Sequence, residues 1–346
     1  MKSSATAQEV ARLAQVSQSA VSRTFTPGAS VSEETRAKVM AAAAQLGYRP
    51  NAMARSLITR QSRIVALVMS YLENQFYPLV IQTLSQKLQK QGYHVLMFIS
   101  DLDEADEVMA EILQYQVDGI VLASTMLSPS LASSCAASGV PIVQFNRVAD
   151  TSATARYGTN AVTSDNRRGG AMVAELLLAR GFERIAFIAG LERSSTSVER
   201  ERGFNEALAE AGHKVYRRAV GDYSFEGAQA ATRALFAAEG LPPDALFVAN
   251  DHMAIAAMDV LRNELALRVP EDVSVVGFDD VPQAAWGAYQ LTTVVQSVEK
   301  MVAATVELLH GQMRGDAPPR HVVVPCELVL RRSVRPPANA SGAASD

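Results

Sequence analysis

Apolar and polar positions recur with a helical period in two short segments near the start of the chain. The first segment follows residues 6–9, an S/T-x-x-E capping-box pattern in which Thr6 and Glu9 would satisfy each other's free backbone amides. The second follows Ser17, a residue type that commonly caps a helix, and ends near Phe25. The apolar residues that would form the buried faces are Val10, Leu13 and Ala14 in the first segment, and Val21 and Phe25 in the second. This pattern predicts two helices joined by a tight turn, a helix-turn-helix.

Helices this short are marginal in isolation, so a third helix is needed to close a core. Ser32 and the two acids after it supply an N-cap and negative charge in the first turn, where the helix dipole favours them. Gly47 would end this helix, since glycine often occupies the residue that follows a helix. Its inner face would consist of Val39, Ala43 and Leu46. Gln15 stands in the turn before the second helix, where the backbone φ is commonly positive and a residue other than glycine costs about 1–2 kcal/mol.

Beyond residue 63, apolar runs alternate with amphipathic stretches, and the alternation occurs twice. The strand-like runs are 64–69, 95–99, 119–123 and 141–145, then 184–189, 214–220, 245–248 and 273–277. The helical stretches are 78–91, 104–115, 166–180, 199–211, 226–239 and 253–264. Continuous apolar strands separated by helices indicate parallel sheets covered on both faces. We therefore expect two doubly wound α/β lobes with a cleft between them, and a ligand at the carboxyl ends of their strands.

Charge separates the first part of the chain from the rest. Residues 1–63 contain nine Lys and Arg and three Asp and Glu, a net charge of +6, whereas the remainder contains 23 and 33, a net charge of −10. A basic segment on an acidic body favours a local polyanionic partner. The second helix would expose Gln18, Ser19, Ser22 and Arg23, polar groups that suit base edges in the major groove of DNA. A solvated helix face with no such partner is the alternative.

Composition excludes several other classes of protein. The 346 residues allow two or three domains, and 48% hydrophobic with 20% charged residues is an ordinary soluble balance. The two cysteines, Cys135 and Cys326, give neither a disulfide framework nor metal-ligand spacing, which fits a reducing cytoplasm. No apolar signal region follows Met1 and no apolar stretch of about 18 residues occurs, so we expect neither secretion nor a membrane span. The motifs of dinucleotide, phosphate or serine-hydrolase sites are missing, so we expect no enzyme, cofactor or metal.

Two segments, VARLAQVSQSAVSRTF and VSEETRAKVMAAAAQLGYRPNAMARSL, resemble the LacI/GalR (lactose-repressor) family of bacterial transcription regulators, and the resemblance extends over nearly the whole chain. It implies an all-α helix-turn-helix head with a hinge helix, followed by a periplasmic-binding-protein-like α/β domain of two doubly wound parallel-sheet lobes. The domains expected are the head at 1–49, the hinge helix and linker at 50–63, the effector-binding and dimerisation domain at 64–335, and a disordered tail at 336–346. The first lobe would hold 64–163 and 292–324, and the second 164–291 and 325–335, with crossings near Thr163, Leu291 and Val324.

The resemblance also implies which residues contact DNA. Pro50 would precede a hinge helix that forms on the operator, and Leu57 corresponds to a leucine wedged into the minor groove, where it would unstack a base step. A packing contact between head and body is the alternative for Leu57. The residues at DNA-contact or capping positions are Thr6, Ser17, Gln18, Ser19, Ser22, Arg23, Thr35, Tyr48, Asn51, Ala54 and Leu57.

The effector residues implied by the family mostly follow predicted strands. The family positions are Phe76, Tyr77, Arg200, Asn250, Asp251 and Asp279. Asn146, which follows a strand and can both donate and accept, and Tyr223 and Trp286 are further cleft candidates. The Arg200 guanidinium could bind a carboxylate, phosphate or vicinal diol in two-pronged fashion, and the Asp279 carboxylate could accept hydrogen bonds from hydroxyl groups. Each has a structural alternative: packing for the aromatic residues, a helix-start ion pair for Arg200, and a turn for Asp279. Together they favour a polar ring compound such as a sugar, sugar acid or nucleoside.

The leading hypothesis is a cytoplasmic transcription regulator, most simply a repressor, that binds a palindromic operator as a homodimer and responds to a small polar effector. While bound to its operator it would be associated with the nucleoid. Two-fold symmetry is expected because one head reads only a few base pairs. The alternatives are a cytoplasmic solute-binding protein without regulatory output and a DNA binder that responds to no ligand. Double-stranded DNA, the effector and a second copy of the chain are the partners expected.

Overall fold

The computed structural model describes residues 5–26, 28–50, 61–70, 72–99, 105–123, 137, 139–148, 159–315 and 318–337. The chain divides into two compact units, a head that ends at Arg63 and a body that begins at Ile64. Several expectations lie outside the described residues: the hinge helix with Asn51, Ala54 and Leu57, the thiol of Cys135, and the tail from residue 338 onward.

The described residues of the head form three helices: α1 (Ala7–Ala14), α2 (Gln18–Thr24) and α3 (Glu33–Leu46). Each begins at the residue that the sequence predicts, because the side chains of Thr6, Ser17 and Ser32 accept backbone N–H groups of the first turn at 3.2–3.3 Å. The full capping box is present, since the Thr6 amide also donates to the Glu9 carboxylate at 2.8 Å. Gln15 adopts φ 56°, the left-handed conformation expected in the turn.

The core of the head differs from the prediction at two leucines. The valines at positions 10, 21 and 39 are fully buried, but Leu13 is 43% exposed and Leu46 is 38% exposed. Successive helical residues are rotated by roughly 100°, so the face that buries Val10, Ala11 and Ala14 turns Leu13 away. Leu46 occupies the last position of α3, before the left-handed Gly47, and is only partly covered there.

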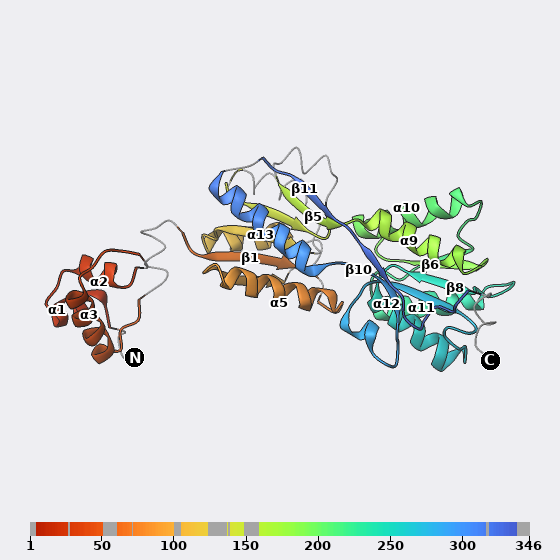
Figure 1. Ribbon diagram of the computed structural model, residues 1–346, viewed down its shortest axis with the longest axis horizontal. Helices are drawn as coiled ribbons and strands as arrows, with labels where there is room; N and C mark the ends of the chain where they lie inside the picture. The colour runs from red at the N-terminus through yellow and green to blue at the C-terminus, as the bar shows by residue number, and fades with distance from the viewer. Residues whose placement is uncertain are drawn as a thin grey trace, which may run out of the picture. The chain divides into compact units, whose positions relative to one another are not determined.

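Two six-stranded sheets form the body, and each is covered by helices on both faces (Figure 1). The first sheet has the order β11-β5-β4-β3-β1-β2 and is parallel throughout. Its strands are β1 (Ile64–Met69), β2 (His94–Ile99), β3 (Gly119–Ala123), β4 (Ile142–Phe145), β5 (Asn160–Ser164) and β11 (His321–Val324). Its helices are α5 (Phe76–Gln89), α6 (Ala105–Gln114) and α13 (Val298–Arg314).

The second sheet has the order β12-β10-β9-β8-β6-β7, in which only β12 is antiparallel to its neighbour. Its strands are β6 (Ile185–Ala189), β7 (Arg217–Val220), β8 (Ala245–Val248), β9 (Ser274–Asp279), β10 (Thr292–Val295) and β12 (Glu327–Val329). Its helices are α9 (Asn166–Ala179), α10 (Ser195–Glu210), α11 (Phe225–Ala237) and α12 (Asp251–Asp259). A π-turn at Val260–Glu264 follows α12, and a 3₁₀ turn at Pro282–Ala285 follows β9. The predicted architecture, a helical head and two parallel-sheet lobes, is confirmed.

The chain passes between the two lobes three times. These passages follow β5, β10 and β11, at Asp165, Gln296 and Pro325. The expected crossing near Leu291 is wrong, because β10 pairs with β9 and β12 inside the second sheet. The four residues of β10, Thr292–Val295, belong to the second sheet, and the chain leaves that lobe only after them.

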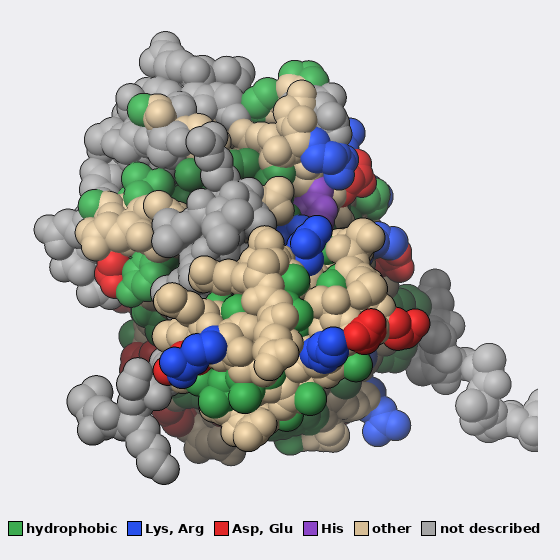
Figure 2. Space-filling model, turned by 90° about the vertical axis from the view of Figure 1, so that its left-hand side faces the viewer, with side chains coloured by type: hydrophobic (Ala, Val, Ile, Leu, Met, Phe, Trp, Pro, Cys, Tyr) green, Lys and Arg blue, Asp and Glu red, His purple; other side chains and the backbone are tan. Residues whose placement is uncertain are grey.

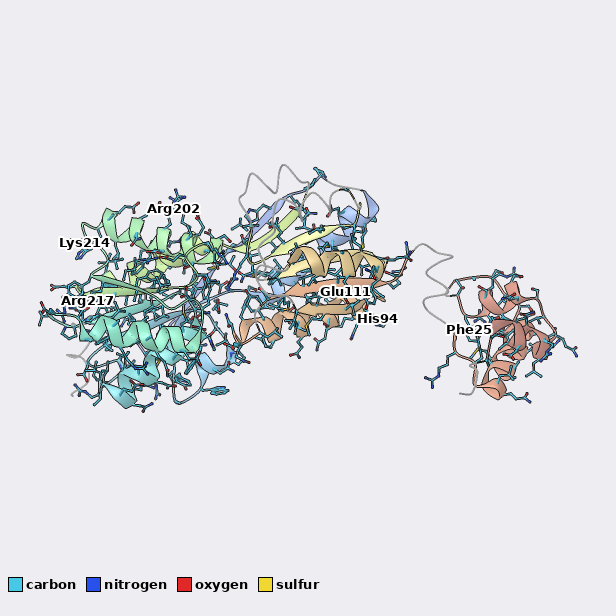
Figure 3. The ribbon with its side chains drawn as sticks, turned by 180° about the vertical axis from the view of Figure 1, so that it is seen from behind. Phe25, His94, Glu111, Arg202, Lys214 and Arg217 are labelled. Atoms are coloured by element: carbon cyan, nitrogen blue, oxygen red, sulfur yellow. The ribbon has the colours of Figure 1, made fainter. Side chains whose placement is uncertain are left out.

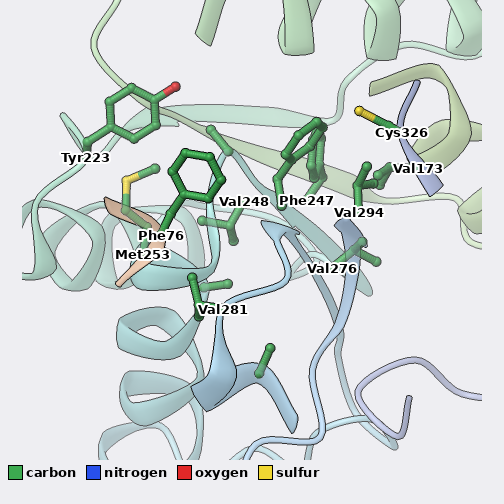
Figure 4. Close-up of a cluster of buried hydrophobic side chains, with 14 of the residues drawn as sticks. Phe76, Val173, Tyr223, Phe247, Val248, Met253, Val276, Val281, Val294 and Cys326 are labelled. Carbon is green, nitrogen blue, oxygen red and sulfur yellow. The ribbon is translucent and has the colours of Figure 1, made fainter. Parts of the chain in front are cut away.

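One large buried cluster extends through both lobes. Phe76 begins α5 in the first lobe, yet it belongs to the same cluster as Met253 and Val281 of the second. Figure 4 shows the Phe76 ring among these side chains and near Tyr223. Apolar packing therefore joins the lobes beside the point at which their strands end.

Candidate ligand cleft and nucleic-acid interface

Polar side chains from both lobes line one cavity in the body. All of them stand at or after the carboxyl ends of strands, the position expected in open parallel sheets. The first lobe contributes Asn74, Tyr77, Asn146 and Arg147, and the second contributes Thr196, Arg200, Tyr223, Asn250 and Asp279. The space left between them is about 10 Å³, room for roughly one water molecule. A larger ligand would therefore have to move the lobes or displace contacts between the lining residues.

Asp279 is the centre of the hydrogen-bond network in this cavity. Its Oδ1 accepts from Gln296 Nε2 at 2.6 Å and lies 3.4 Å from Arg200 Nη2, while its Oδ2 accepts from Asn74 Nδ2 at 2.9 Å. Burial raises the pKa of the Asp279 carboxyl above its usual value, although Arg200 and the amide donors oppose that effect. The bond from Asn74 connects the first lobe directly to the second.

Arg200 is held rigidly on α10 with its side chain 2% exposed. Its Nε donates to Asn166 Oδ1 at 2.9 Å, and its Nη1 donates to the Ala249 carbonyl at 2.5 Å. The guanidinium carbon lies 3.7 Å from the centre of the Phe278 ring. These contacts fix the guanidinium so that Nη2 faces Asp279, an arrangement suited to presenting one positive edge to a ligand.

Two buried amide groups in the cavity have unused hydrogen-bonding atoms. Asn146 donates to the Tyr77 hydroxyl at 3.2 Å, but its Oδ1 has no partner among the described residues. The Oδ1 of Asn250 caps α12 by accepting from the Met253 amide at 2.9 Å, and within the same described part its Nδ2 has none. Buried polar atoms are normally satisfied, so one acceptor from the first lobe and one donor from the second are available for hydrogen bonds with a ligand.

Hydroxyl and aromatic groups complete the lining. The hydroxyls of Thr196 and Tyr223 lie 2.9 Å apart, and the Arg147 guanidinium stands 5.2 Å from the centre of the Tyr223 ring. Burial raises the pKa of the Tyr77 hydroxyl, so it remains protonated at neutral pH. The site thus offers hydroxyl, amide, carboxylate and guanidinium groups around one small space.

Three residues expected to line the cleft do not line this cavity. Phe76 packs in the apolar cluster against Phe145, with ring centres 6.4 Å apart. Asp251 is fully buried and accepts from Thr293 Oγ1 at 2.6 Å and from the Val281 amide at 2.9 Å, so it ties the start of α12 to β10 and to the loop after β9. Trp286 is 55% exposed at the end of the 3₁₀ turn.

Sequence reasoning did not single out three residues of the lining: Asn74, Arg147 and Thr196. Asn74 and Arg147 stand beside predicted residues in the segments after β1 and β4. Thr196 lies one helical turn before Arg200 on α10, so helical spacing from that arginine is the signal that could have identified it.

The head presents α2 with a polar outer face. Gln18, Ser19, Ser22 and Arg23 are all exposed, whereas Ala20, Val21 and Thr24 are buried. Figure 2 shows a face that includes side chains of the body, on which Lys and Arg side chains mostly stand apart from one another. A helix with one apolar and one polar face of this kind can enter a major groove with its side chains free.

The other predicted contact residues of the head already have structural roles. Thr6 and Ser17 cap α1 and α2, and the Ser17 hydroxyl lies 2.9 Å from that of Ser19. Thr35 Oγ1 accepts from the Ser32 hydroxyl at 2.8 Å. Tyr48 packs against Phe25, which is labelled in Figure 3, with ring centres 5.7 Å apart. Capping and packing do not preclude phosphate contacts, because these side chains stay at the surface of the head.

The residues that the structure describes contain neither a metal-binding cluster nor a membrane-spanning helix. No group of three or more His, Cys, Asp or Glu side chains is arranged to hold a metal ion. Among those same residues, none of the helices combines the length and apolar character needed to cross a membrane.

Comparison with known proteins agrees with both parts of the fold. Residues 6–51 match the model for bacterial regulatory proteins of the lacI family, and residues 174–334 match a periplasmic binding protein-like domain. The HTH-type transcriptional regulator CelR of Thermobifida fusca is 34% identical over 95% of this chain and 98% of its own. The HTH-type transcriptional repressor PurR of Photobacterium profundum is 29% identical over 96% and 99%. These relatives are transcription regulators, not enzymes.

Solved structures show the same likeness. The lac repressor dimer bound to operator and the anti-inducer ONPF has 27% identity and a TM-score of 0.85, and the match covers 96% of this chain and 99% of that one. A complex of the regulator CelR with cellobiose has 31% identity and a TM-score of 0.70, over 95% and 99%. With a related regulator 34% identical along almost its whole length, this chain belongs to the lacI family of bacterial regulatory proteins.

Proposed function

We propose that this chain is a cytoplasmic transcriptional repressor that binds a palindromic operator as a homodimer and is controlled by a small polar effector. In this proposal residues 1–49 read the operator, residues 50–63 connect the units, and the body senses the effector and dimerises. The related lac repressor was crystallised as a dimer on its operator, which supports the same assembly here. Two heads on a two-fold axis would contact two half-sites about one helical turn of DNA apart.

The observation that carries the effector proposal is the pair of unsatisfied amide atoms, Asn146 Oδ1 and Asn250 Nδ2. They come from different lobes and border one cavity with Asp279 and Arg200. A ligand with neighbouring hydroxyl groups can donate to the first amide and accept from the second, while a carboxylate and a guanidinium hold further hydroxyls. A sugar, sugar acid or nucleoside meets these requirements, and the relative CelR was solved with cellobiose.

Effector binding would act through the contacts between the lobes. Asn74 reaches Asp279 across the cleft, and the Val148 amide reaches the Ser195 hydroxyl at 3.1 Å. A ligand that inserts between these groups changes the angle of one lobe to the other. Since coupling is reciprocal, DNA and effector would alter each other's affinity by the same factor. Either release or promotion of operator binding is compatible with this geometry.

A thermal-shift screen of the purified chain with sugars, sugar acids, polyols and nucleosides tests the effector proposal. A ligand that binds only the folded protein raises Tm by mass action. We expect at least one sugar-like compound to do so and to change operator affinity measured by fluorescence anisotropy. A ligand that stabilises Asn146→Ala and Asn250→Ala as strongly as the unaltered protein would place the effector elsewhere.

The head assignment has a separate test with Arg23→Ala. If Arg23 contacts a base, the substitution should cost about 1–3 kcal/mol and relax sequence preference at one operator position. Lys38→Ala removes the same charge from α3, where Lys38 pairs with Glu34 at 2.7 Å, and should preserve that preference. Competition binding with operators altered one base pair at a time measures both. An equal loss on every sequence would show that Arg23 contacts phosphate only.

A further inference from the structure

The second lobe contains a larger cavity that shares no lining residue with the cleft. Its volume is about 600 Å³, within the range of roughly 300–1,000 Å³ typical of small-molecule sites. Arg180, Arg262, Arg331 and Arg332 line it, together with Glu271 and Tyr289. These arginines come from the end of α9, the π-turn after α12 and the segment after β12, so the fold gathers them from three parts of the chain.

Part of the positive charge in this cavity is not neutralised. Arg180 donates to the Arg335 carbonyl at 3.1 Å, and Arg262 donates to the carbonyls of Ala288 and Val269. Those carbonyl oxygens are neutral, and in the described parts of the chain neither arginine forms a salt bridge. The exposed Arg332 side chain has no hydrogen bond or ion pair within those same parts. Arg180, Arg262 and Arg332 thus line one space, and within the described residues no carboxylate forms a salt bridge with any of them.

The acidic groups nearby do not cancel this charge. Glu271 is exposed at the cavity wall. Asp280 pairs with Arg331 at 2.6 Å, and Asp259 is hydrogen-bonded to the Tyr289 hydroxyl. With Asp280 assigned to Arg331, three arginines remain against the exposed Glu271 and the nearby Asp259, whose carboxyl interacts electrostatically with Arg262. An excess of one positive charge is left.

We propose that this arginine-lined cavity binds a small anion that carries a phosphate group. Guanidinium groups form paired N–H···O bonds with phosphate oxygens, and several of them can share the three terminal oxygens. The apolar side chains of Val269, Pro270 and Val334 provide a wall against which an organic portion can pack. The proposal is independent of which effector occupies the cleft.

The cavity is also connected to the cleft by a short chain of contacts. The Arg331 guanidinium lines the cavity and holds Asp280, the residue next to Asp279. Both aspartates adopt positive φ, at 123° and 57°, a backbone form that few residues other than glycine adopt. An anion that attracts the Arg331 guanidinium would weaken the Arg331–Asp280 ion pair. Asp279, the neighbouring residue in the cleft, would change position as well.

Trp286 provides a direct readout of binding. It is the only tryptophan in the chain and is followed immediately by Gly287, which lines the cavity. We would titrate the full chain with inorganic phosphate, ribose 5-phosphate and ribose at constant ionic strength, and follow tryptophan fluorescence and heat. We expect saturable binding of at least one phosphate compound. Tighter binding of the ester identifies an organic phosphate, and equal binding of both identifies free phosphate.

Two variants decide the site. Arg332→Gln removes an unpaired charge from the cavity and should raise the apparent Kd for phosphate by about tenfold or more, with Tm unchanged. Arg202→Gln removes the same charge from the outer face of α10, where Arg202 is labelled in Figure 3, and should leave the Kd unchanged. Equal weakening in both variants or an unsaturable response to every phosphate compound would overturn the proposal.

Discussion

Asp279 and Arg200 form an ion pair in which both side chains are 2% exposed. Among the described residues, Asp279 is the only carboxylate in a salt bridge with Arg200. Asp279→Asn would leave the guanidinium buried without a counter-charge, which costs about 3–5 kcal/mol. We therefore expect a large drop in the free energy of unfolding, measured with urea. A denaturation midpoint equal to that of the unaltered protein would mean that the Arg200 charge is balanced by the carbonyl oxygens around it.

Asp272→Asn is a suitable control for that measurement. Asp272 also pairs with an arginine, Arg268, at 2.6 Å, but this pair is at the surface and its members are four residues apart in sequence. Its hydrogen bonds with Arg268 lower the pKa of the Asp272 carboxyl to about 2. Water solvates both groups once the pair is broken, so the substitution should barely alter the midpoint.

Helices α9 and α10 approach each other backbone to backbone, and glycines make this possible. A Cβ on Gly203 would lie 1.8 Å from the Arg167 carbonyl oxygen, and one on Gly170 would lie 2.0 Å from that of Arg200. Gly203→Ala should force the helices apart and destabilise the body by about 1–3 kcal/mol or more. Because Arg200 stands on α10, weaker effector binding should accompany the lower Tm.

Gly311 supplies the matched control for this substitution. It lies within α13, where a Cβ would meet nothing within 4 Å. Gly311→Ala should raise stability by about 0.5–1 kcal/mol, because alanine has the better helix propensity. Thermal unfolding of the two variants should therefore shift in opposite directions. Destabilisation by both would indicate that helix α13 cannot tolerate a methyl group at that position.

Elements with strong apolar patterns were predictable, and polar ones were not. The apolar runs at 64–69, 119–123 and 245–248 predicted the bounds of β1, β3 and β8 correctly, because buried parallel strands are apolar throughout. The buried strands β5 and β10 have the sequences NAVTS and TTVV. Their asparagine, serine and threonine residues interrupt the apolar run from which a buried strand is predicted. The misplaced crossing near Leu291 follows from that omission. Pattern alone therefore finds apolar strands more readily than buried strands rich in polar residues.

The cleft was predictable as a location and less so as a set of residues. Position after a strand identified Asn146, and together with the family resemblance it identified Asn250 and Asp279, because the topology brings strand ends together. The same rule could not separate Asp279, which faces the cavity, from Asp251, which binds β10 and the loop after β9. The direction in which a side chain points depends on the local backbone conformation, for example on the positive φ of 68° at Asn146. Position in the sequence does not give that conformation.

At the scale of the whole molecule, the opposite charges of head and body predict two different responses to salt. Residues 1–63 carry +6 and the remainder −10. A homodimer with several Lys and Arg contacts to phosphate should lose on the order of 10³-fold in operator affinity between about 50 and 200 mM salt. Binding of an uncharged sugar should change little over that range. Parallel losses for both ligands would instead point to salt-induced unfolding of the chain.

The three passages between the lobes, at Asp165, Gln296 and Pro325, have a mechanical consequence. Cutting any one of them leaves two covalent connections, so a single proteolytic nick cannot release a lobe. Three parallel connections also resist sliding and twisting of one lobe against the other. Bending about the line through the three connections is the motion that they resist least. The lobes should therefore open and close mainly by bending about this line. A small ligand that stabilises one angle between the lobes would then change the arrangement of the whole body.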